Sequence, residues 1–132
     1  MPEVPRLVAG AMVRLFATDV TVVHTEQVAP RLRRLRFAHP SLVGKPLAPH
    51  DHIEFRVDDR CFRHYSIEHA DPEAGTLDVL FFLHGMGPGS AWAASVQPGA
   101  TAAMLGPGAG RFRVDPAAPR HVFLGDETTI GL

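Results

Sequence analysis

Several short stretches of the chain alternate between apolar and polar residues, a period typical of a β-strand with one buried face. In residues 52–57, Ile53, Phe55 and Val57 would share the face toward the core. Residues 19–28 are rich in valine and threonine, which favour the pleated conformation. Further strands are expected at 32–37, 61–67, 77–83, 101–105, 111–114 and 120–124, and the apolar residues 7–13 are expected to form a first strand or arm.

Turn-forming residues separate these stretches. Glycine and proline mark a loop at 39–52, a turn at 71–75 and a loop at 106–110. The one persuasive helix covers 90–96, with Ser90 as its N-cap and Pro98-Gly99 after its end. A helix this short needs packing, which Trp92 would provide. Short strands with one small helix predict a mainly β fold, a closed antiparallel barrel.

Composition narrows the class of protein. The length of 132 residues suits one domain, and 45% hydrophobic with 20% charged residues is ordinary for a globular chain. A net charge of -1 gives no overall field to attract nucleic acid or an anionic membrane. The single Cys61 excludes an internal disulfide. No apolar run approaches membrane-spanning length and no targeting signal is evident, so a cytoplasmic location is expected.

Four arginines lie close together in the second predicted strand: Arg31, Arg33, Arg34 and Arg36. They would form either a basic patch or, as we favour, a solvated edge strand that charge protects from pairing with other chains. A barrel that binds oligonucleotides through this strand would need exposed aromatic residues between the basic ones, and Phe37 alone is thin support.

The first candidate motif is Arg63-His64-Tyr65-Ser66. Arg63 could grip a phosphate as a bidentate fork, and Tyr65 could stack on a planar ring. Strict alternation points His64 and Ser66 to the other face, so Ser66 reaches the same ligand only if the strand ends or bulges there, or if its backbone amide makes the contact. An edge strand with a partly buried tyrosine and a solvated arginine explains this segment at least as well.

The second candidate motif is the glycine-rich stretch 84–90, which leads into the predicted helix. Gly87 and Gly89 let the backbone approach a ligand closely, and free amides at a helix start favour an anion. An ordinary loop before a helix is the alternative, and no Gly-Lys-Ser/Thr follows as in a nucleotide-hydrolase loop. If both motifs border one cleft, an aromatic stack beside an anion site suits a dinucleotide.

Other chemistry finds less support. His50-Asp51-His52 lacks a matching second pair with metal-site spacing, so no metal site is expected. Ser66 and Ser90 lack the context of a hydrolase nucleophile. Cys61 between two arginines is most simply a small strand residue.

The two motifs together resemble a known family. Arg63-x-Tyr65-Ser66 resembles the flavin-binding signature of the ferredoxin-reductase-like superfamily. His84-Gly85-x-Gly87-Pro88-x-Ser90-x-Trp92-Ala93, followed by Pro98-Gly99, Gly106-Pro107 and Gly125-Asp126-Glu127-Thr128, is similar to the siderophore-interacting proteins, the ferric-siderophore reductases.

This resemblance implies a six-stranded antiparallel Greek-key barrel that binds FAD over residues 1–119, with 120–132 as the truncated start of a nicotinamide-binding α/β domain. It implies reduction of ferric iron in a siderophore, with release of ferrous iron and with NAD(P)H or another electron donor. A non-catalytic flavin-binding or partner module that has lost its NAD(P)H domain is the alternative. Where an anionic siderophore is the substrate, Arg33, Arg34, Arg36 and Lys45 are candidates by charge alone.

The cofactor site carries over by motif. Arg63 would bind flavin phosphate, Tyr65 would pack on the isoalloxazine, and Ser66 would hydrogen-bond its reactive edge. The glycine-rich stretch would hold the pyrophosphate. The full implied set is Arg63, His64, Tyr65, Ser66, Leu83, His84, Gly85, Gly87, Pro88, Gly89 and Ser90.

Three departures from the family pattern stand out. Gly89 replaces a frequent alanine, and Glu68-His69 stand where an arginine often follows. The chain ends at Leu132, so residues 120–124 would be a strand of a missing sheet. Such a strand is expected to fray, to cover the barrel, or to pair with another copy in a homo-oligomer.

Overall fold

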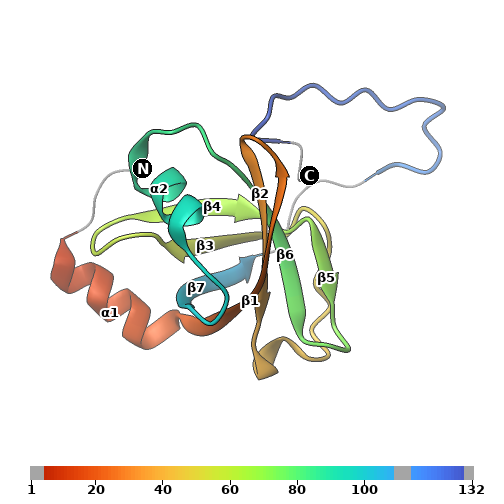
Figure 1. Cartoon of the computed structure of the whole chain (residues 1–132). Coiled ribbons are helices and arrows are strands. Elements are labelled where there is room, and N and C mark those ends of the chain that lie inside the picture. The colour runs from red at the N-terminus through yellow and green to blue at the C-terminus, as the bar shows by residue number, and fades with distance from the viewer. Residues whose placement is uncertain (1–4, 109–113, 130–132) are drawn as a thin grey trace.

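The computed structural model describes residues 5–108 and 114–129. Seven strands form a single sheet in the order β4-β3-β7-β1-β2-β6-β5, and every described pair is antiparallel (Figure 1). The elements in chain order are α1 (Arg6–Phe16), β1 (Thr18–Ala29), β2 (Leu32–Ala38), the 3-10 helix η1 (Pro40–Leu42), β3 (His52–Arg56), β4 (Phe62–Ser66), β5 (His69–Asp71), β6 (Thr76–Phe82), α2 (Gly87–Ser95) and β7 (Thr101–Gly108).

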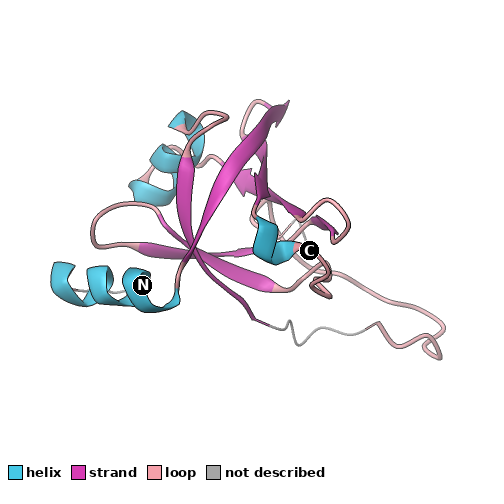
Figure 2. Ribbon diagram, turned by 90° about the horizontal axis from the view of Figure 1, so that it is seen from below, coloured by secondary structure: helices cyan, strands magenta, loops and turns pink. Residues whose placement is uncertain are grey.

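The sheet curls around one core. Phe37 on β2 and Phe55 on β3 belong to strands that are not neighbours, yet their ring centroids lie 4.5 Å apart. Tyr65 on β4 and Phe81 on β6 are also 4.5 Å apart across the curl. Figure 2 shows the strands crossing around this centre with the helices outside. The expected mainly β, antiparallel fold is therefore confirmed.

The prediction that the sheet closes into a six-stranded barrel is wrong in detail. Among the described residues no strand ladder joins β4 to β5 or β6, so the seven-stranded sheet is open. The Glu68 amide, between β4 and β5, donates to the Asp78 carbonyl of β6 at 2.9 Å, but this bond adjoins the ladder of β6 with the three-residue β5 and not a ladder with β4. The short β5 has no alternation by which the sequence could reveal it.

The core follows the predicted alternation. On β3, Ile53 and Phe55 are buried while His52 is exposed, and on β1, Val20 and Val22 face inward. The fully buried larger side chains are Phe37, Phe55, Phe81, Leu35, Leu42, Ile53, Ile67, Leu77, Met104, Val20, Val22 and Val79. Burial of apolar surface on this scale is the main stabilising contribution to such a sheet.

Two expected strands are not strands. Residues 7–13, expected as a strand or arm, lie in helix α1, which buries Ala9 and leaves Leu7 and Leu15 exposed. Residues 120–124 form no strand, because no described strand lies beside them to complete a ladder. The strand expected at 111–114 falls largely on residues outside the described ones. β7 runs on through Gly108, so the loop expected from 106 begins later.

The arginine-rich strand is not an edge. β2 lies between β1 and β6, and Arg33 is only 7% exposed. Arg34 contacts Glu68 and Glu26, at 2.8 Å and 2.6 Å, and these hydrogen bonds hold the pKa of its guanidinium above the ordinary value. The Asp78 carboxylate similarly raises the pKa of Arg36, which it meets at 2.7 Å. Because Arg34 and Arg36 are paired with carboxylates and Arg33 is buried, these described arginines form no free basic patch.

No helix among the described residues has the length and apolar character needed to cross a membrane.

Candidate functional site

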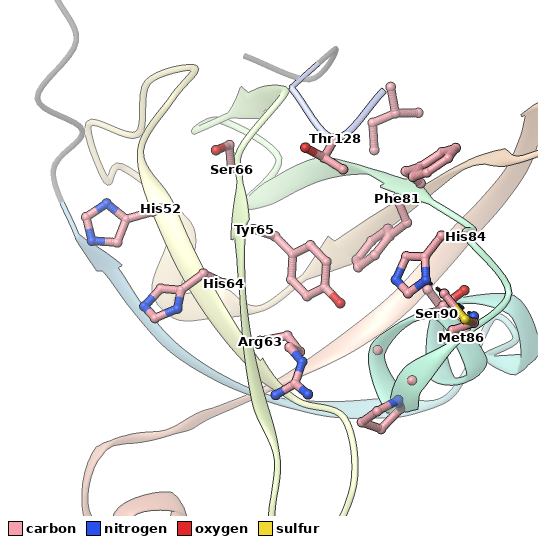
Figure 3. A pocket seen from close by; sticks show the side chains of 16 residues that line it. His52, Arg63, His64, Tyr65, Ser66, Phe81, His84, Met86, Ser90 and Thr128 are labelled. Atoms are coloured by element: carbon pink, nitrogen blue, oxygen red, sulfur yellow. Dashed lines mark hydrogen bonds between the residues drawn. The ribbon is translucent and has the colours of Figure 1, made fainter. Parts of the chain in front are cut away.

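A cleft of about 410 Å³ opens between β4 and the start of α2 (Figure 3). The cleft therefore brings the two candidate motifs together. The residues that line it are His52, Arg63, His64, Tyr65, Ser66, Leu80, Phe81, Phe82, His84, Met86, Gly87, Pro88, Gly89, Ser90, Ala93 and Thr128.

The position of β4 at one end of the strand order explains how both of its faces border this cleft. Arg63 and Tyr65 point toward Phe81 and α2, whereas His64 points to the opposite side of the strand (Figure 3). Ser66 is the last residue of β4 and also lines the cleft. β4 thus ends at Ser66, which is one of the ways in which this side chain could reach the same ligand as Arg63 and Tyr65.

Tyr65 forms the floor of the cleft. Its ring centroid lies 4.5 Å from that of Phe81 and 6.1 Å from that of Phe55. Burial raises the pKa of the phenol to about 12, and the nearby charge of Arg63 acts in the opposite direction. The hydroxyl is therefore protonated at neutral pH and can donate a hydrogen bond to a ligand.

Two glycines of the second motif have a structural requirement. Gly87 has a φ of 76°, a left-handed conformation that L side chains rarely adopt. A Cβ at Gly89 would lie 2.7 Å from the Tyr65 hydroxyl and 3.2 Å from Cγ of Arg63. Only a bare backbone lets the start of α2 lie this close to β4.

The start of α2 differs from the expected one. The helix begins at Gly87, with Met86 as its N-cap and Pro88 in its first turn, so the prediction of Ser90 as N-cap is wrong. Proline fits the first turn because its missing N–H has no partner there. The Ser90 hydroxyl instead accepts a hydrogen bond from the Gly85 amide at 3.1 Å. No described side chain caps the N-terminus, which leaves its first amides for an anion.

Arg33 and Arg31 hold helix α2 and the loop before it in place through hydrogen bonds. The buried Arg33 donates to the carbonyls of Ala93, Ala94 and Val96 at 2.7, 2.6 and 2.9 Å. Arg31 lies 4.7 Å over the ring of Phe82, and its Nε donates to the Leu83 carbonyl at 3.3 Å. Alternation places Arg33 on the core face with Leu35 and Phe37, a signal the sequence contained but that its charge obscured.

Nine of the residues implied for the cofactor line the cleft: Arg63, His64, Tyr65, Ser66, His84, Gly87, Pro88, Gly89 and Ser90. Leu83 and Gly85 lie outside its lining. The Leu83 amide donates to the Arg31 carbonyl at 2.7 Å, so this residue supports the loop. His52 and Thr128 also border the cleft but were not among the residues implied for the cofactor; Thr128 belongs to the Gly125-Asp126-Glu127-Thr128 segment of the family resemblance.

The charges of the cleft are few. Arg63 is its one arginine or lysine among the described lining residues. The Nε2 atom of His64 lies 2.8 Å from a carboxylate oxygen of Glu54 on β3. Within residues 5–108 and 114–129 no group of three or more histidine, cysteine or acidic side chains is arranged to hold a metal ion.

Residues 50–111 match the model of the siderophore-interacting FAD-binding domain, and they contain both candidate motifs. The chain thus contains part of a siderophore-interacting FAD-binding domain. FAD is accordingly the cofactor of this domain, as the resemblance implied.

Individual relatives support this assignment. The chain is 35% identical over 134 residues to the mycobactin import ATP-binding/permease protein IrtA of Mycobacterium tuberculosis, covering 92% of this chain and 16% of IrtA. The siderophore-interacting protein SipS from Aeromonas hydrophila is 32% identical with a TM-score of 0.63, over 70% of this chain and 43% of SipS. The chain thus spans less than half the length of either relative.

The fold itself is shared more widely. Phthalate dioxygenase reductase, a modular protein for electron transfer from pyridine nucleotides, has a TM-score of 0.60 at 18% identity, over 76% of this chain and 32% of that one. At this identity the likeness shows the ferredoxin-reductase-like fold alone.

Proposed function

We propose that this domain holds FAD in the cleft between β4 and α2 and reduces ferric iron bound by a siderophore, with release of ferrous iron. The observation that carries the proposal is the close approach at Gly89, which brings Arg63, Tyr65 and the start of α2 to one cleft. The family assignment supports a flavin-binding role in siderophore iron handling.

The residues present fit the flavin. The uncapped amides of Gly87 and Gly89 suit the pyrophosphate, and the Arg63 guanidinium, beside the same helix start, adds a permanent cation. The half-buried ring of Tyr65 offers an apolar surface for the isoalloxazine, and its protonated hydroxyl a donor. Ser66, at the end of β4, would hydrogen-bond the polar edge of the ring. Bound there, FAD supplies one- and two-electron transfer chemistry.

The protein's own contribution is position and electrostatics. Arg33 fixes the far end of α2 and Arg31 fixes the loop before it, so the phosphate-binding amides are held in place. The aromatic residues Phe81 and Tyr65 keep water from the inner wall of the cleft. The electron donor would be NAD(P)H or another reductant, and a reaction that uses NAD(P)H would take place in the cytoplasm. In this proposal, residues 120–132 would form the start of a nicotinamide-binding domain.

The experiment separates flavin binding from reduction. We expect the purified chain to be yellow or to bind added FAD, with binding weakened about tenfold or more in Arg63→Gln because a charge-assisted phosphate contact is lost. Arg60→Gln, on the turn before β4, is the matched control. A colourless protein that does not take up FAD would overturn the proposal.

Reduction is tested with a chemical reductant in place of NAD(P)H. FAD-loaded protein reduced with dithionite under argon is mixed with a ferric siderophore, and flavin reoxidation is followed together with ferrous iron in a colorimetric trap. The proposal expects both signals at matching stoichiometry. FAD binding without reoxidation would instead identify a non-catalytic flavin-binding module.

A further inference from the structure

The cleft continues around the edge of β4 beyond the part assigned to the flavin. On the far side of this strand from Tyr65 and Arg63, the side chains of His52 and His64 project together (Figure 3). Their ring centroids lie 6.3 Å apart, and both residues line the cleft. Arg63 and Tyr65, which are proposed to hold the flavin phosphate and ring, do not lie on this face.

His64 is oriented by its neighbour on β3. The 2.8 Å contact between its Nε2 and the Glu54 carboxylate fixes the ring, and the side chain remains 50% exposed. With Nε2 engaged, Nδ1 is the nitrogen that remains for a ligand, and it carries a proton when the imidazole is cationic. The titratable groups that face His64 are Glu54 and His52 on β3, whereas Arg63 on its own strand points to the other side.

The imidazole of His52 occupies space that is open because Gly108 has no side chain. A Cβ at Gly108 on β7 would lie 2.6 Å from Nε2 of His52, so the bare backbone of this strand makes room for the imidazole. The ring consequently lies at the same mouth of the cleft as His64.

The charge of this outer part is low. The single arginine among the described cleft residues, Arg63, belongs to the inner part, and Glu54 adds a negative charge beside His64. A multiply charged anion would find little compensation there. An uncharged ligand with exposed oxygen atoms would instead find one or two imidazole N–H donors.

We propose that His52 and His64 form a subsite for the electron acceptor, in which the imidazoles hydrogen-bond the oxygen donor atoms of an uncharged ferric trihydroxamate chelate beside the flavin. The inference rests on the proposed function, because it takes the inner part of the cleft to be filled by FAD. His64 acts as a specificity residue that touches the acceptor, and Glu54 is its positioning residue.

The test uses a redox-inert probe. The gallium(III) complex of a cyclic trihydroxamate, which is uncharged, is titrated calorimetrically into the FAD-loaded chain. We expect binding to weaken about tenfold in His64→Gln and in His52→Gln, as for the loss of one hydrogen bond. His24→Gln, an exposed histidine on β1 that does not line this cleft, should bind like the wild type.

A further readout separates this role from a general structural one. The affinity of His52→Gln and His24→Gln for FAD should stay within about twofold of the wild type, a difference smaller than one hydrogen bond.

The outcomes distinguish failure of this subsite from failure of the proposed function. If the wild-type chain takes up no FAD, the proposed function fails and this subsite fails with it. If FAD binds but the probe does not, or binds equally well to both variants, the subsite alone is overturned. Tighter binding of a triply negative gallium tris(catecholate) than of the trihydroxamate would also overturn it.

Discussion

The guanidinium of Arg33, on β2, donates a 2.7 Å hydrogen bond to the carbonyl of Ala93 in the last turn of α2. The same group reaches the carbonyls of Ala94 and Val96, so one buried cation satisfies three acceptors at a helix C-terminus. A positive charge there also complements the helix dipole, whose other end faces the cleft. The sheet therefore holds the phosphate-binding end of α2 by gripping its opposite end.

Replacement of Arg33 should be costly. Arg33→Met leaves three carbonyls without their donor, and we expect a loss of about 3 kcal/mol in the free energy of unfolding. Urea denaturation measures this, and FAD affinity should fall with it. Arg31→Met, which removes a more exposed arginine with one backbone contact, should cost under about 1 kcal/mol. Equal effects of the two substitutions would contradict the bracing role.

Much of this fold could be predicted because β-branched runs and strict alternation decide strands locally. Residues 19–28 lie in β1 and residues 52–56 in β3, which ends one residue earlier than expected. Helix α1 could not be predicted in this way: its apolar residues lie on several sides, and the helix has no side-chain cap. β5 is too short to show a period.

The site was partly predictable for similar reasons. Arg63 and Tyr65 share a strand face, and the glycine-rich stretch marks a helix start, so each half of the cleft is a local property. The joint use of both faces of β4 is not local, because it depends on β4 being an end strand of the sheet. His52 and Thr128 enter the cleft through contacts distant in sequence. Whether the eleven implied residues contact FAD remains a prediction.

The contact between Gly89 and Tyr65 predicts a coupled pair of substitutions. In Gly89→Ala the new Cβ would meet the Tyr65 hydroxyl at 2.7 Å, so we expect a loss of about 1–2 kcal/mol in stability. In the Tyr65→Phe background the hydroxyl is absent, and the same alanine should cost less. A double-mutant cycle by urea unfolding measures the difference, and an equal cost in both backgrounds would exclude the contact.

Tyr65 is the only tyrosine of the chain, so its titration can be read directly from the tyrosinate absorbance. We expect the pKa of the folded protein to lie near 12, above the value of 10.0 for an unperturbed phenol, because burial disfavours the anion. In concentrated urea the pKa should return to about 10. A folded-state value near 10 would show that the ring is more exposed than it is in this structure.

The same shift makes stability depend on pH in the alkaline range. The buried neutral phenol contributes fully below pH 10.0, where both states keep the proton, and this contribution is lost as the pH rises toward 12. A shift of this size corresponds to about 2–3 kcal/mol over that window. Tyr65→Phe cannot ionise and serves as the matched control. Parallel stability curves for the wild type and this variant would exclude the effect.

The apolar run near the C-terminus predicts self-association. Val122, Phe123 and Leu124 are 82%, 70% and 93% exposed, and three adjacent apolar side chains at a surface favour a contact with another molecule. We expect sedimentation velocity to show association that grows with protein concentration and weakens when all three are replaced by serine. The replacement should leave stability nearly unchanged, since these residues contribute little to the core. A wild-type chain that stays monomeric throughout would exclude this contact, and with it the homo-oligomer expected from the sequence at residues 120–124.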